Sequence, residues 1–156
     1  MNNVTDPLAT QHYFDDISVG DEFEETQQPR LENVLAYIKT SRMLSGDGRF
    51  TDPERARAIG LEKPIVPGPM SASMLTRFVT DWMGPLGRVL SLDVSFRRPV
   101  QHDDLLRCVA LVTDVNGEGD FEGTGTGAVH LDVTLENERG EKPVQGTAIV
   151  ELPRRA

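Results

Sequence analysis

Cysteine is almost missing from this chain of 156 residues, in which Cys108 is the only one. A single cysteine excludes an internal disulfide framework and fits a reducing compartment. The first residues, MNNVTDPLATQHYFDD, have neither a basic start nor an apolar run, so we expect no signal peptide. No apolar run approaches the ~18 residues of a membrane span. We therefore expect a cytoplasmic protein that makes no use of a membrane.

Positive charge is also scarce. Lysine and arginine total 16 against 25 acidic residues, which gives a formal net charge of −9. Nucleic-acid binding needs a basic surface that displaces counterions from phosphates, and no basic run here is longer than two arginines, so nucleic acid is excluded as a partner. The segment FRRPV, residues 96–100, is the one local basic patch. It fits either an anionic ligand or two solvated arginines at a strand end.

Signals for metals and for familiar nucleophiles are missing as well. The three histidines, His12, His102 and His130, show no metal-ligand spacing to one another or to the cysteine. His102 is interpreted as a turn residue, and His130 as a residue on an exposed or dimer-forming strand face. The glycine-rich segment 116–127 leads into a strand and carries three acidic residues, so it is interpreted as a hairpin connection rather than a phosphate loop. We expect no cofactor and no metal.

What the sequence does contain, in its first half, is helical periodicity. Apolar residues at helical spacing predict a helix over about 30–43. Asp52 as N-cap, Pro53 in the first turn and Gly60 as a stop predict a short helix between them. A long helix is predicted over about 69–83, with a wide apolar stripe; the stripe comprises Met70, Met74, Leu75, Phe78, Val79, Trp82 and Met83, and the polar positions between include Ser71, Ser73, Thr76 and Arg77.

Strand patterns make up most of the rest. One alternating segment follows the turn at 19–21, and four more fill the chain after residue 87. Early helices and late consecutive strands predict an α+β fold with a mostly antiparallel sheet. The wide apolar stripe of the long helix requires a sheet over most of its surface. We expect a polar N-terminal tail at 1–12 and one domain over 13–156.

The start of the long helix, IVPGP, is a candidate binding feature. Glycine there exposes backbone N–H groups at the positive end of the helix dipole, where they can hold an oxyanion. From the local sequence alone, an ordinary helix start that needs a glycine turn is the favoured explanation of Gly68. Met70, Met74, Phe78 and Trp82 likewise fit either an apolar tunnel for a ligand or simple core packing under the sheet.

Five segments together carry a resemblance to a known family: YFDDISVGDEF, LSGD, DPERARAIG, PIVPG and FRRPV. Over about residues 13–152 the chain resembles the MaoC-like family of hot-dog-fold enoyl-thioester hydratases and dehydratases. The resemblance implies a single hot-dog fold, a curved antiparallel sheet wrapped around one long central helix. It also implies an acyl-CoA or acyl-carrier-protein thioester as ligand, and a homodimer or a heterodimer with a related hot-dog subunit.

The family's hydratase motif runs Ser-Gly-Asp-x-Asn-Pro-Ile/Leu-His-x-Asp, and its Asp and His act together on a water. Residues 45–47 match the first part, which makes Asp47 the candidate catalytic residue. The loop that follows is two residues short, and Phe50 stands where the family has its His. Near the central helix, where hydratases often have His-Gly, the pair is Pro67-Gly68. The resemblance thus implies that Gly68 keeps its role as oxyanion donor.

Loss of the His has a chemical consequence. Phe50 cannot give or take a proton, and losing one of two cooperating groups commonly lowers a rate by about 10²–10⁴. The first hypothesis is therefore a catalytically incomplete subunit that binds thioesters beside an active relative, with Phe50, Met70 and Met74 lining its pocket. The second is an active (R)-specific enoyl-CoA hydratase that uses Asp47 with a different proton donor. The third is a thioester-binding dimer without enzymatic activity.

Overall fold

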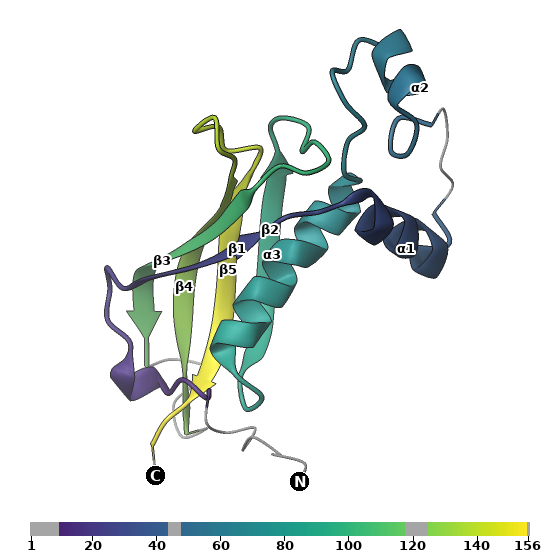
Figure 1. The fold of residues 1–156 in the computed structure, drawn as a ribbon. Helices are drawn as coiled ribbons and strands as arrows, with labels where there is room; N and C mark the ends of the chain where they lie inside the picture. The colour runs from purple at the N-terminus through teal and green to yellow at the C-terminus, as the bar shows by residue number, and fades with distance from the viewer. Residues whose placement is uncertain (1–9, 44–47, 118–124, 156) are drawn as a thin grey trace, which may run out of the picture.

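A computed structural model describes residues 10–43, 48–117 and 125–155. It contains the α+β fold that the sequence predicts (Figure 1). The elements in chain order are a short 3₁₀ helix Phe14–Asp16, β1 Glu22–Gln27, α1 Leu31–Ser41, α2 Pro53–Ala58, α3 Gly68–Met83, β2 Arg88–Phe96, β3 Leu106–Asn116, β4 Thr126–Glu136 and β5 Val144–Pro153.

The five strands form one antiparallel sheet in the order β1-β3-β4-β5-β2. Because side chains alternate between the two faces of a strand, the apolar positions of each strand gather on one face. That face is fully buried along β3, β4 and β5, and α3 lies across it (Figure 1). β1 and β2 are the edge strands, and β2 has an irregular register between Val89 and Ser91.

The long helix α3 confirms the prediction for 69–83 to within one residue. Leu75, Phe78 and Val79 are buried among the inner residues of the sheet. Trp82 stacks on Phe23 of β1, with ring centroids 4.2 Å apart, and on His12, at 5.1 Å. Phe78 and Trp82 therefore belong to the core under the sheet, which favours the core interpretation of these two residues.

The two small helices differ in how far they are packed. In α1 only Val34 is buried, and Leu31 and Leu35 of its apolar stripe are exposed. In α2 the predicted N-cap is present, because the Asp52 carboxylate accepts hydrogen bonds from the backbone N–H groups of Glu54 and Arg55 at 2.9 and 3.3 Å. Capping thus occupies the Asp52 carboxylate, as the sequence predicts.

The two ends of the described chain are held together beside the sheet. Arg154 and Arg155 form ion pairs with Asp15 and Asp16. The hydrogen bond from Arg155 is the main cause that holds the pKa of Asp16 below its ordinary value. Nearby, Gln11 donates to the carbonyl oxygen of Met83 at 2.9 Å, which satisfies an acceptor at the C-terminal end of α3.

Two further findings concern the single cysteine and membrane-spanning helices. Cys108 lies in β3 on the buried face, and burial raises the pKa of its thiol to about 12, so the thiol is an inert core group. Within the described ranges, no helix is both long enough and apolar enough to cross a membrane.

Packing of α3 on the sheet predicts a large cost for Leu75→Ala. Leu75 is fully buried, so truncation removes transfer free energy and leaves a cavity, and we expect the free energy of unfolding to fall by about 2–5 kcal/mol. Urea denaturation followed by far-UV circular dichroism measures this. Leu86→Ala, at an exposed position, should change it by no more than about 0.5 kcal/mol. A loss for Leu75→Ala no larger than that of Leu86→Ala would contradict the packing described.

Candidate functional site

A hollow of about 270 Å³ lies where α3 begins. Its volume lies just below the range of about 300–1,000 Å³ that is usual for small-molecule sites. Most of its lining comes from the loop before α3, the first turn of α3, and the end of β2 with the residues after it. Phe50, from the segment before α2, and Val144, at the start of β5, complete it. The lining residues are Phe50, Ile65, Val66, Gly68, Ser71, Phe96, Arg97, Arg98, Pro99, Val100 and Val144. We call it the α3 hollow.

Backbone hydrogen bonds fix the walls of the α3 hollow. Segment 64–66 runs beside segment 100–102, with Val66 N donating to Val100 O at 2.7 Å and His102 N donating to Pro64 O at 3.0 Å. On its other side, Ile65 N donates to Arg49 O at 3.0 Å. The residue next to Arg49 is Phe50, so this bond places the phenyl ring at the hollow. The loop that carries Phe50 is therefore tied to the same backbone that leads into α3.

Gly68 is the first residue of α3, and its surroundings leave it open. Its backbone φ is not in the left-handed region, and an added Cβ would meet only the Phe96 ring, at 3.5 Å. Neither the backbone conformation nor protein contacts therefore demand glycine here. The next residue, Pro69, has no N–H, and the N–H groups of Met70 and Ser71 both donate to Pro67 O, at 3.0 and 3.1 Å. Gly68 N–H is thus the donor that the first turn of α3 leaves for a ligand, with the helix dipole behind it.

The predicted site residues do not all come together. Phe50 and Gly68 line the α3 hollow. Met70 and Met74 line another hollow, of about 360 Å³, with residues of β1, the segment after it, Asn33 and Arg77. Their proposed role in ligand binding stays a prediction. Asp47 lies outside the described residues, and so does the rest of the LSGD segment.

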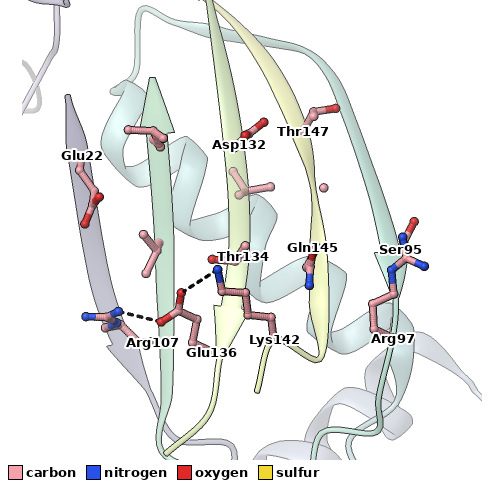
Figure 2. Close-up of a pocket in the computed structure, with 14 residues that line it drawn as sticks. Glu22, Ser95, Arg97, Arg107, Asp132, Thr134, Glu136, Lys142, Gln145 and Thr147 are labelled. Atoms are coloured by element: carbon pink, nitrogen blue, oxygen red, sulfur yellow. Dashed lines mark hydrogen bonds and ion pairs between the residues drawn. The ribbon is translucent and has the colours of Figure 1, made fainter. Parts of the chain in front are cut away.

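Two arginines stand at the α3 hollow. Arg98 pairs with Glu141 at 3.2 Å. The Arg97 backbone N–H donates to Pro143 O at 2.7 Å, and its exposed side chain forms no ion pair with any described residue. Arg97 also lines a second hollow on the open face of the sheet (Figure 2). The basic patch seen in the sequence therefore lies at the candidate site, and one of its two charges is not neutralised by a described carboxylate.

The hollow on the open sheet face is larger, about 580 Å³, but its chemistry is different. Three of its charged groups form ion pairs: Arg107 pairs with Glu136 at 2.7 Å, and Lys142 approaches Glu136 at 3.8 Å (Figure 2). Arg107 also pairs with Glu24 of β1 at 3.3 Å. Such exposed ion pairs on one sheet face are typical of a solvated surface. The α3 hollow is therefore the better candidate site.

His102 lies behind the wall of the α3 hollow and was missed by the sequence analysis, which treated it as a turn residue. Its side chain is only 6% exposed, and no group in the described chain hydrogen-bonds its Nε2. Burial is the main cause that lowers the pKa of His102, while the carbonyl groups of Phe50 and Ile65 act in the opposite direction. The turn itself is real and rigid, since the buried Asp104 accepts from Gln101 N at 3.1 Å and binds Arg139 through both carboxylate oxygens.

Ser71 is the second polar residue that the sequence did not single out. It lines the α3 hollow with only 1% of its surface exposed. Its spacing of three residues from Gly68 puts both on one side of the helix, which is a signal that periodicity alone could have given.

Comparison with known proteins assigns the family. A family model described as MaoC like domain matches residues 22–137. The chain belongs to the MaoC-like family. No curated protein matches the sequence.

Solved structures of other proteins share the fold. The (R)-hydratase from A. caviae involved in PHA biosynthesis is 23% identical, with a TM-score of 0.76 over 88% of this chain and 98% of that one. A chain of the ChsH1-ChsH2 complex from Mycobacterium tuberculosis is 20% identical, with a TM-score of 0.71 over 86% and 98%. A further Mycobacterium tuberculosis protein with a double hot-dog fold is 19% identical, with a TM-score of 0.74 over 94% of this chain and 46% of that one. The hot-dog fold predicted from the resemblance is confirmed.

The buried, neutral His102 predicts a pH-dependent stability. Its pKa is lower in the folded chain than the ordinary value near 6.5, so the unfolded chain binds the proton first as the pH falls. The contribution of neutral His102 to the free energy of unfolding is fully present above about pH 6.5. Below that pH the contribution falls, by at most about 1.4 kcal/mol per pH unit. Urea unfolding at pH 7.5, 6.0 and 5.0 should show a smaller decline in His102→Gln than in the wild type. His130→Gln, on the half-buried outer side of β4, is the matched control, and equal pH slopes for His102→Gln and the wild type would contradict the expectation.

Proposed function

We propose that this protein binds an acyl or enoyl thioester at the α3 hollow and works as a catalytically incomplete subunit of a hydratase or dehydratase. One observation carries the proposal: Phe50, at the position where the family's hydratases have His, lines the same hollow as Gly68. A phenyl ring provides apolar surface but no proton. The residues that bind a thioester are thus retained, while half of the proton-transfer pair is replaced.

Each part of the hollow has a role in this proposal. Gly68 N–H donates to the thioester carbonyl oxygen, helped by the positive end of α3. Phe50, Val66 and Val100 provide apolar walls for the carbons next to it. Arg97 and Arg98 lie where the phosphate of a coenzyme A or acyl-carrier-protein arm can interact with them. A local basic patch of this kind allows an acidic protein to bind an anionic ligand.

A second subunit is part of the proposal. β2 is an edge strand, so its outer backbone N–H and C=O groups have no partner strand in the described chain. Phe96, at the end of β2, is 54% exposed and also lines the α3 hollow. Pairing of another hot-dog subunit along β2 would cover these groups and bring its residues beside the hollow. The heteromeric ChsH1-ChsH2 complex among the structural neighbours supports a related subunit as the partner, and a homodimer remains the simpler assembly.

Activity assays separate the proposal from its alternatives. We expect the purified protein to bind crotonyl-CoA and a longer trans-2-enoyl-CoA, seen as a rise in Tm, because a ligand selective for the folded state stabilises it. Alone it should hydrate neither. Mixed with a relative that carries the intact Asp–His pair, it should raise turnover above that of the relative alone.

The variant Asp47→Asn is the control for this experiment. Hydration by the wild type alone that falls about 10²-fold or more in Asp47→Asn would overturn the proposal in favour of an active hydratase. Binding without turnover in any mixture would favour a thioester-binding dimer without enzymatic activity.

Gly68→Ala tests the binding surface directly. The added methyl group meets Phe96 at an ordinary contact distance, so we expect folding and stability to be retained. It also projects toward the space that the thioester would use, so affinity for crotonyl-CoA should fall about tenfold or more, measured by isothermal titration calorimetry. Ser73→Ala, at an exposed position of the same helix, should bind like the wild type. Unchanged affinity in Gly68→Ala would place the ligand elsewhere.

A further inference from the structure

The hydroxyl groups of α3 differ in one respect. Those of Ser73, Thr76 and Thr80 donate to carbonyl oxygens of the preceding turn, at 2.8, 2.9 and 3.0 Å. Ser71 is the most buried of the four, and its hydroxyl has no hydrogen-bond partner among the described residues. Among the described side chains, the one fully buried polar atom without a partner is His102 Nε2, so the Ser71 oxygen keeps a small accessible surface. Since this hydroxyl lines the α3 hollow, a ligand in the hollow is the group that can satisfy it.

The backbone of the first turn offers a ligand few donors. Pro69 has no N–H, and the N–H groups of Met70 and Ser71 are engaged with Pro67 O. Gly68 N–H therefore stands alone as a backbone donor in this turn. A carbonyl oxygen has two lone pairs and can accept two hydrogen bonds. Stabilisation of a developing oxyanion commonly uses more than one donor.

Helix geometry brings the hydroxyl of Ser71 close to the backbone N–H of Gly68. Residues three apart lie on one side of a helix, and helical side chains lean toward the N-terminus. The Ser71 side chain therefore lies over the turn that contains Gly68. The walls around it are apolar, with Val66 and Val100 each 3% exposed and Val144 fully buried. A hydrogen bond formed among such side chains is stronger than one in water.

We propose that the Ser71 hydroxyl is a second donor to the thioester carbonyl oxygen, beside Gly68 N–H. This inference rests on the proposed function, because it names a further residue of the same thioester site. It assigns Ser71 a hydrogen bond that neither the family motif nor the sequence pattern supplies. It also makes the site selective for a carbonyl oxygen rather than for apolar chain alone.

A pair of ligands that differ by the carbonyl oxygen tests the proposal. Butyryl-CoA is the thioester, and S-butyl-CoA is a thioether with the same chain length and no carbonyl oxygen. By isothermal titration calorimetry, the wild-type full chain should bind the thioester about tenfold or more tightly than the thioether. Ser71→Ala should lose most of that preference through weaker binding of the thioester, with affinity for the thioether unchanged. Ser73→Ala should keep the wild-type preference.

A second pair of variants distinguishes loss of the hydroxyl group from a folding defect. Thr and Val have nearly equal shape and differ by one hydroxyl, so Ser71→Thr should keep a preference for the thioester that Ser71→Val lacks. Equal loss of affinity for both ligands in Ser71→Ala, or an equal preference in the Thr and Val variants, would overturn the role of Ser71 and leave the proposed function standing. Failure of the wild type to bind either ligand would overturn both.

Discussion

The packing of α3 against the inner face of the sheet is the interaction on which the rest of the structure depends. Leu75, Phe78 and Val79 bring a helix of 16 residues onto β3, β4 and β5. Burying this face leaves the first turn of α3 in one fixed place, next to the end of the edge strand β2. A candidate binding site and a free strand edge therefore adjoin each other because of core packing. One hydrophobic contact surface thus positions both the α3 hollow and the free edge of β2.

A short backbone segment before α3 connects the packed core to the α3 hollow and fixes the position of its wall. Segment 64–66 is held between Arg49 on one side and segment 100–102 on the other. It has apolar or conformationally restricted residues, Pro64, Ile65, Val66 and Pro67, so little freedom is lost when it is fixed. Phe50 and Gly68 are 18 positions apart in the sequence, yet this segment places both at one hollow. The position of Phe50 thus follows from backbone hydrogen bonds and not from its own burial alone.

Periodicity predicted the strands and α3, and the capping residues predicted the Asp52 cap, because each depends on residues close together in the sequence. The family resemblance predicted that Phe50 and Gly68 share a site, and they do share a hollow. Helical spacing places Ser71 on the side of Gly68, but the burial of Ser71 and His102 depends on tertiary contacts that neighbouring residues do not encode. The apolar stripe of α3 is too wide for the sequence to show which of its residues line a ligand site. Met70 and Met74 line a different hollow from Gly68. Asp47 lies outside the described residues, so its role stays a prediction.

Phe50 and the two arginines together suggest what remains when proton transfer is removed from such a site. Binding a thioester uses neutral donors, apolar walls and a positive charge near the phosphate, and none of these needs the missing His. Proton transfer needs two cooperating groups at fixed distances, so under the proposed function a single replacement impairs it without removing any group that binds the ligand. The arginines also act locally in a chain of net charge −9, because screening confines the repulsion from distant carboxylates to roughly 8 Å at physiological salt. Arg98 is paired with Glu141, which leaves Arg97 as the charge that, under the proposed function, interacts with the phosphate of a bound thioester.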